Sequence, residues 1–219
     1  MTSEVAICNL ALSHLGDSAT VASISPPDGS IQAEHCARFY PLARDAMLEA
    51  RQWGFATTRV ALAQLTSESP SWDYCYALPN SALNIIAVLP PDADDDYTGA
   101  MTVTWPYAPP VVGEVPTQPF VCETLASGAT VVYTDQPSAV VRYTLAITDP
   151  SKFTPLFVTA LSWLLASHVA GPLLKGEAGR SAASTCMGQY TYWMEQATES
   201  DANQRRVRPN HTPTWIAVR

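Results

Sequence analysis

Residues 149–174 read DPSKFTPLFVTALSWLLASHVAGPLL, and the rest of the chain is organised around this stretch. Asp149 is able to cap the free amide groups at the start of a helix, and Pro150 costs little at that place, because its missing N–H would have no partner there. Pro155 is an alternative first turn. The residues that recur at helical spacing are Phe157, Leu161, Leu164, Leu165 and His168, with Val158, Ala160 and Val169 beside them. A helix that is apolar on nearly every side lies inside a bundle, so we expect this one to be the core helix.

The same stretch does not read as a membrane span. A bilayer core requires about 20 uninterrupted apolar residues, and this sequence is shorter and more interrupted. Gly171-Pro172 is expected to end or kink the helix.

Three further helices are predicted. The first covers residues 3–15, and a connector of turn-forming residues follows at 17–29. The second runs from about 30 to 53 with a kink at Pro41, and Trp53 and Phe55 are expected to hold its end against the core. The last covers about 178–202.

Residues 72–147 change to short segments rich in Val, Tyr, Trp and Thr, which are typical of strands. The predicted strands are Trp72–Leu78, Leu83–Leu89, Met101–Tyr107, Phe120–Thr124, Thr130–Thr134 and Val140–Ile147. Ser127-Gly128 predicts a hairpin turn. The aromatic residues Trp72, Tyr74 and Tyr76 alternate, which favours one sheet face over a platform for stacking bases.

The fold class is therefore α+β: a four-helix bundle-like core with an inserted antiparallel β subdomain and an extended C-terminal arm. The expected parts are 1–71 (the first two helices), 72–148 (the β subdomain with its proline-rich loops), 149–204 (the last two helices) and 205–219 (the arm). No internal repeat is visible.

The net charge of −8 argues against a protein that coats nucleic acid. The charge is unevenly placed, because residues 205–219 contain four arginines and no acidic residue. The other 204 residues carry eight of the twelve basic residues and all twenty acidic ones, a net charge of −12.

The five cysteines are scattered, odd in number and never in a CxxC pair, which favours free, mostly buried thiols in a reducing compartment. The N-terminal residues lack a basic region and include Glu4, so they do not predict a signal peptide. We expect neither secretion nor membrane insertion.

An acidic run is the best candidate for a metal site, and it fails a simple test. Its members are Asp92, Asp94, Asp95 and Asp96. A calcium loop of the EF-hand type requires Gly where Tyr97 stands and a bidentate Glu where Val103 stands. We expect a loop that faces solvent or a channel and binds no metal.

Other candidates for chemistry are equally weak. His35 beside Cys36 lacks further ligands, and the remaining histidines, His14, His168 and His211, show no ligand spacing. An acid/base pair drawn from Glu4, Glu34 and Glu49 is conceivable in a hydrolase, but carboxylates on amphipathic helices are usually a solvated face. No nucleophile elbow, phosphate loop or dinucleotide fingerprint is present, so we expect no enzyme and no cofactor.

Four segments, in order and at suitable spacing, carry a resemblance to a known family. They are ICNLALSHLGDS (7–18), ARFYPLARDAMLEARQWGFATTRVAL (37–62), WDYCYALP (72–79) and VVRYTLAITDPSKFTPLFVTALSWLLASHVAGPLL (140–174). Together they resemble the head-to-tail adaptor of short-tailed bacteriophages, often called tail tubular protein A, over about residues 3–200. The closing PNHTPTWIAVR also resembles the extended arm in which that family ends.

The resemblance implies a structural virion protein in the tail, assembled in the host cytoplasm. It implies a ring, usually of twelve copies, between the portal protein and the tail nozzle protein, with DNA passing through. No catalytic residues are implied. The long insert at 90–119 departs from the family.

The residues themselves fit such a role. Acidic channel walls let DNA slide without specific binding, whereas Lys or Arg contacts would hold it. The arm carries Arg205, Arg206 and Arg208 for pairing with carboxylates and Trp215 and Ile216 as apolar anchors, so we expect it to lie on the portal or on a neighbouring copy. Two alternatives stay open: a cell-wall hydrolase of the tail, and a tube or terminator protein of another tail type, which should be mostly β.

Overall fold

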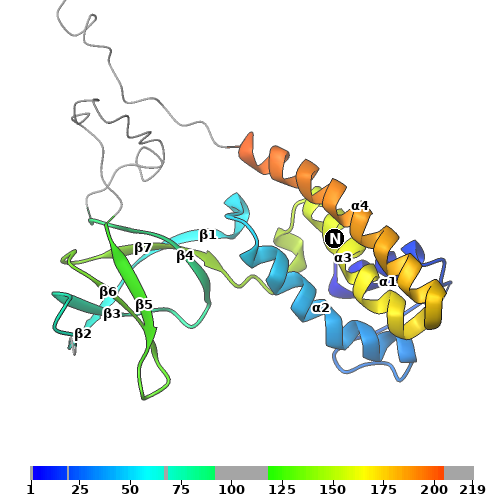
Figure 1. The fold of residues 1–219 in the computed structure, drawn as a ribbon, viewed down its shortest axis with the longest axis horizontal. Helices are drawn as coiled ribbons and strands as arrows, with labels where there is room; N and C mark the ends of the chain where they lie inside the picture. The colour runs from blue at the N-terminus through cyan, green and yellow to red at the C-terminus, as the bar shows by residue number, and fades with distance from the viewer. Residues whose placement is uncertain (1, 19, 67–68, 92–117, 205–219) are drawn as a thin grey trace, which may run out of the picture. The chain divides into compact units, whose positions relative to one another are not determined.

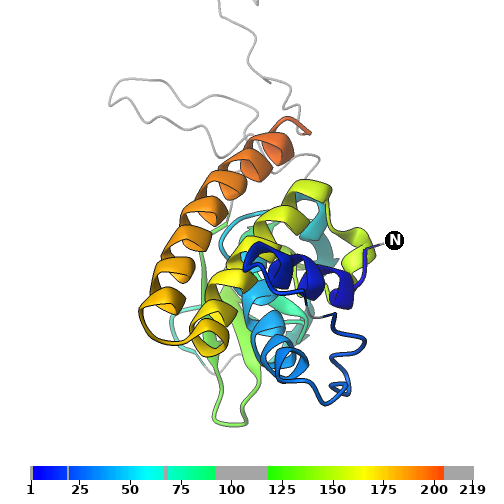
Figure 2. The same cartoon turned by 90° about the vertical axis from the view of Figure 1, so that its right-hand side faces the viewer.

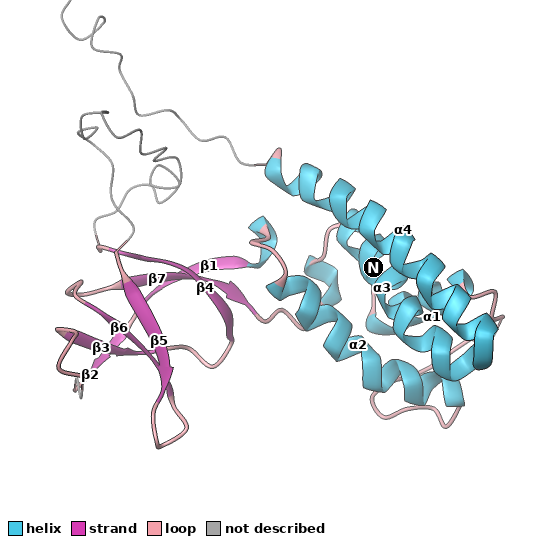
Figure 3. Cartoon of the chain, in the orientation of Figure 1, coloured by secondary structure: helices cyan, strands magenta, loops and turns pink. Residues whose placement is uncertain are grey.

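The computed structural model describes residues 2–18, 20–66, 69–91 and 118–204. These residues form two compact units. One contains the described residues up to Ala56 and from Ala146 onward, and the other is Thr57–Leu145. Figure 3 shows that the α-helices belong to the first unit and the strands to the second. The chain is thus of mixed helix and sheet, as the α+β prediction requires.

Serine caps fix the starts of the first two helices (Figure 1). Helix α1, Glu4–His14, begins where the Ser3 hydroxyl accepts a hydrogen bond from the Ala6 N–H at 3.1 Å. Helix α2, Ile31–Glu49, begins in the same way at Ser30. The prediction extended α2 to residue 53, but the helix ends at Glu49. Pro41 lies inside it, as expected.

The turn after α2 places an aromatic ring back against the end of α2. The buried Trp53 indole donates its Nε1–H to the Met47 carbonyl at 2.7 Å. Trp53 and Phe55 each meet Phe157 edge-on, with ring centroids 5.1 Å apart, and Phe153 lies 4.9 Å from Phe157. The prediction that Trp53 and Phe55 hold the end of α2 against the core is confirmed.

Helix α3, Pro155–Leu174, is the core helix; its start differs from the first reading of 149–174, and its last residue is the same. Thr154 caps it, whereas Asp149 caps a separate 3-10 turn, η3, at Pro150–Lys152. The alternative start at Pro155 is therefore correct. The expected stop at Gly171-Pro172 is wrong, because the helix continues to Leu174 and ends at Lys175, whose φ is 54°.

Half of the side chains of α3 are buried, and they face α1, α2 and α4. They are Phe157, Ala160, Leu161, Ser162, Leu164, Leu165, Ala166, Ser167, Val169 and Ala170. The statement that this stretch is too short to span a membrane is wrong by length: among the described residues, α3 is the one helix that is long and apolar enough. However, 56% of that window is buried inside the protein.

Helix α4, Gly176–Ala202, packs along α3, as Figure 2 shows. Gly179 permits the closest approach: a Cβ there would stand 3.1 Å from the Ala170 carbonyl and 3.3 Å from the Gly171 Cα. The helix starts two residues before the predicted Ala178, and Lys175 alone separates it from α3. Helices α2 and α4 both pack on α3.

The strand region begins at Thr57, not at residue 72 as expected. The described strands are β1 Thr57–Ala61, β2 Ala63–Leu65, β3 Tyr74–Ala77, β4 Ala82–Leu89, β5 Phe120–Thr124, β6 Thr130–Thr134 and β7 Val140–Leu145. They form two antiparallel sheets in the orders β1-β7-β4 and β2-β3-β6-β5. Residues 1–71, which were predicted to contain the first two helices, therefore also contain two strands, β1 and β2, that were not predicted. The predicted strand Met101–Tyr107 lies outside the described residues.

The two sheets pack on each other through a small core of Tyr76, Val88, Val132 and Ala139. The β5–β6 hairpin turns at Gly128, whose φ of 83° favours glycine, which confirms the turn at Ser127-Gly128. The prediction of one aromatic face is wrong in part. Tyr74 and Tyr76 stack with centroids 6.2 Å apart, but Trp72 precedes the strand and packs with Cys75 in a different cluster.

Candidate interaction surfaces

The residues that the sequence reading singled out as sites lie outside the described residues. These are Asp92, Asp94, Asp95 and Asp96 of the acidic run and Arg205, Arg206, Arg208, Trp215 and Ile216 of the arm. The structure therefore places neither group, and both remain predictions. His211 lies in the same undescribed segment.

Two of the three carboxylates considered for a hydrolase, Glu34 and Glu49, lie too far apart to act as a pair. Glu34 and Glu49 are exposed at opposite ends of α2. Fifteen residues of α-helix separate them by about 22 Å, whereas the two acids of a glycoside hydrolase lie within about 10 Å. A pair of Glu34 and Glu49 is thereby excluded.

Metal ligands do not gather either. Within the described ranges, no group of three or more His, Cys, Asp or Glu side chains is placed to hold a metal ion. His35 and His168 instead each stack on Phe39, with centroids 6.4 Å and 6.0 Å from it. His35 and Phe39 both belong to α2, so it is the His168 contact that joins α2 to α3.

His14, at the end of α1, has a defined tautomer. Its ring stacks on Trp163 with centroids 3.6 Å apart, and its Nε2 lies 3.0 Å from the Ser162 hydroxyl. The Ser162 hydroxyl donates its own proton to the Thr159 carbonyl at 2.8 Å. It must therefore accept from His14, so Nε2 carries the hydrogen. Burial lowers the pKa of His14, which keeps the ring neutral at pH 7.

A groove of about 450 Å³ opens beside this stack. Its lining residues are His14, Leu15, Trp163, Ala178, Ser181, Ala182, Thr185 and Cys186. None of them carries a full charge at neutral pH, since burial also raises the pKa of the Cys186 thiol. We name this feature the α1/α4 groove.

The α1/α4 groove continues onto a surface that the sequence reading overlooked. Residues 181–194 of α4, SAASTCMGQYTYWM, contain no charged residue, and much of this stretch is exposed. The signal was present in the sequence as a gap in the charge pattern between Arg180 and Glu195. Helix exteriors usually carry charges, so this neutral face is unusual for a solvated surface.

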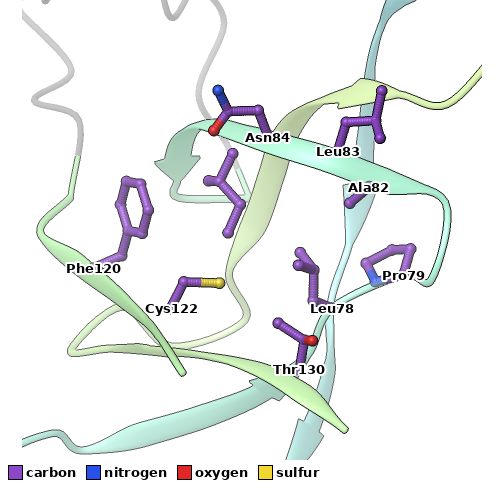
Figure 4. Close-up of a pocket in the computed structure, with 9 residues that line it drawn as sticks. Leu78, Pro79, Ala82, Leu83, Asn84, Phe120, Cys122 and Thr130 are labelled. Carbon is purple, nitrogen blue, oxygen red and sulfur yellow. The ribbon is translucent and has the colours of Figure 1, made fainter. Parts of the chain in front are cut away.

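A second opening lies between the two sheets (Figure 4). Its volume is about 540 Å³, and its lining is mostly apolar: Leu78, Pro79, Ala82, Leu83, Asn84, Ile85, Phe120, Cys122 and Thr130. Two register shifts in β4, at Ala82/Asn84 and Ile85/Ala87, lie in its wall. Burial raises the pKa of the Cys122 thiol in this cleft, which lowers the share of reactive thiolate at neutral pH.

The described thiols are free, as predicted. Four are buried and Cys122 is exposed. The thiols of Cys8 and Cys36 meet between α1 and α2, where a hydrogen bond from Cys8 lowers the pKa of Cys36. Both side chains have no exposed surface, so they serve the core.

A buried carboxylate closes the helical unit. Asp201, 5% exposed near the end of α4, accepts hydrogen bonds from the Gly54 N–H at 2.9 Å and 3.1 Å, one to each oxygen. The lack of a side chain at Gly54 permits this close approach, because a Cβ there would lie only 3.2 Å from an oxygen of that carboxylate. This contact joins parts of the chain that are far apart in sequence, and no local sequence pattern predicts it.

Neither the models of known protein families nor the curated protein sequences contain a match to this chain.

Proposed function

We propose that this chain is a structural subunit of a phage virion: a head-to-tail adaptor that forms a ring between the portal protein and the tail nozzle protein. In this role it is no enzyme and needs no cofactor. Its finer architecture is a four-helix bundle-like body that carries an inserted β subdomain and ends in an extended arm.

The main support is the order of the four resembling segments. Three of them contain α1, α2 and the β7–α3 region, and these helices pack together around α3 in one unit. Segments that are well separated in the sequence thus contribute to one core. A tube or terminator protein of another tail type should be mostly β, which does not fit a chain with four α-helices in its described part.

Electrostatics also favours a conduit over a DNA-binding protein. Residues 1–204 carry a net charge of −12, so the ring would repel DNA phosphates and let the duplex slide. The four arginines of the arm are drawn first to acidic protein surfaces, on the portal or on the next copy.

The direct test is to locate the chain in tailed particles with an antibody raised against it, viewed by electron microscopy. Label at the neck, between head and tail, is expected. Label on tail fibres, or particles that contain none of the chain, would contradict the proposal.

A solution measurement tests the assembly step. We expect the purified chain to be largely monomeric and to form a ring on the portal, because copies of high like charge repel until a template aligns them. Light scattering at micromolar concentration is the measurement. A stable dodecamer without portal would be the opposite result.

A further inference from the structure

The outer face of α2 carries two apolar side chains that nothing in the described chain covers. Ile31 is 65% exposed and Leu42 is 64% exposed, the highest values among the large apolar residues that the structure describes. Eleven residues make almost exactly three turns of an α-helix, so both side chains lie on one face, about 16 Å apart along the axis.

The neutral face of α4 offers a matching pair of features. Ala182 is one of the residues that line the α1/α4 groove, and Tyr192, 53% exposed, stands ten residues further along the helix. Ten residues span about 15 Å, and Thr185 and Gln189 continue the same face between the two features, with Gly188 at its edge. At Gly188 a Cβ would meet nothing within 4 Å, so another backbone is free to approach there.

The geometry points to a second copy of this chain as the occupant: α2 of one copy packs on the neutral face of α4 of the next. Leu42 enters the α1/α4 groove, and Ile31 rests on Tyr192. The two faces belong to different helices that both flank α3, so the contact is head-to-tail, and repeated copies form a ring or a filament. This inference rests on the proposed ring and assigns its subunit contact.

Charge decides the relative direction of the two helices. In the antiparallel arrangement, the exposed Glu49 of α2 comes beside the exposed Lys175 at the start of α4. In the parallel arrangement, Glu49 would instead meet Glu199. Like charges in close contact are unfavourable, so the helices run antiparallel.

The proposed contact buries a small area. Three turns of one helix on another cover about 200 Å² on each copy, well below the roughly 800 Å² per partner of a stable complex. Such a contact does not hold two copies together in dilute solution, and it suffices once a template aligns them.

The test places a photo-cross-linking residue on the full chain at high protein concentration, without portal. Gln189→p-benzoyl-phenylalanine, on the neutral face, is expected to give a dimer cross-linked to the Ile31–Arg38 part of α2 of the other copy, because Gln189 faces about residue 35 in the proposed antiparallel register. Met187→p-benzoyl-phenylalanine is the matched control, because Met187 is exposed on the other flank of the same helix and should not capture α2.

A charge reversal sharpens the result. Glu49→Lys should abolish most of the dimer, and Glu49→Lys combined with Lys175→Glu should restore it, with circular dichroism showing that each variant is folded. A Gln189 cross-link to α4 of the other copy, equal capture from Met187, no cross-linked dimer, or failure of the restoring pair would overturn the inference. The outcome is independent of portal binding, so the proposed function and this contact can fail separately.

Discussion

At the scale of single residues, the carboxylate of Asp201 is the contact with the clearest energetic consequence. It is buried, and it satisfies the Gly54 N–H at the turn that follows α2. Asp201→Ala should lower the free energy of unfolding by about 1.5–3 kcal/mol, because the amide loses a charged acceptor. Urea unfolding measures the loss. Glu199→Ala is the control, since an exposed glutamate should change stability by no more than about 0.5 kcal/mol.

His14 gives the chain a dependence on pH. Burial lowers the pKa of His14 below its unfolded value of 6.5, so the folded state holds the neutral ring. The stability that the neutral His14 ring contributes is therefore fully present above about pH 6.5, and it is lost as the pH falls through the lower pKa of the folded state. His168 shifts in the same direction for the same reason.

We therefore expect the urea midpoint to fall between pH 7 and pH 5, and the fall to be smaller in His14→Gln. Asp28 titrates below this window, because hydrogen bonds from Ser30 and from the Ala22 amide lower its pKa to about 2. Equal slopes for the natural chain and for His14→Gln would refute the assignment.

Residue-level prediction from sequence was right where the partner is local. The predicted helix starts at residues 3 and 30 lie next to the observed ones, because Ser3 and Ser30 cap these helices through amides three residues away. It was wrong for Trp72 and silent on Asp201, since their partners depend on how distant segments pack.

At the scale of elements, two glycines of α4 have opposite roles. Gly179→Ala should destabilise the helical unit by about 1–3 kcal/mol, because the new methyl group would press on the backbone of α3 at Ala170 and Gly171. Gly188→Ala should stabilise the monomer by about 0.5–1 kcal/mol, because alanine is the better helix former and the site is open. Thermal unfolding of both variants compares them directly. A loss of similar size in both would show that helix propensity and space do not govern α4.

The elements with long apolar or cap signals were predicted well, and those defined by distant pairing were not. The strands β5 and β6 match their predicted bounds because they form a local hairpin. The strand β1 was missed, since its partner β7 lies more than 75 residues away and its own burial does not alternate. The stop expected at Gly171-Pro172 was misplaced because a Gly-Pro pair in the last turn of a helix is compatible with two further helical residues.

At the scale of the whole molecule, the arm is the part on which the proposed docking depends. Deletion of residues 207–219, or Trp215→Ala, should weaken binding to the portal protein. Truncating a Trp buried in a tight partner pocket costs on the order of 2–4 kcal/mol, which is roughly thirty-fold or more in affinity. A pull-down with portal protein measures the effect, with circular dichroism as the control for folding. Full binding by the truncated chain would show that the arm is not the anchor.

The pairing of β1 with β7 has a consequence for how such a chain can change. Thr57 and Thr144 are register partners, so the chain leaves the helical part and returns to it at points only about 5 Å apart. A two-residue turn is long enough to bridge that gap, and everything between behaves as a cassette. Its length and surface are free to diverge while the path of the four described helices stays the same.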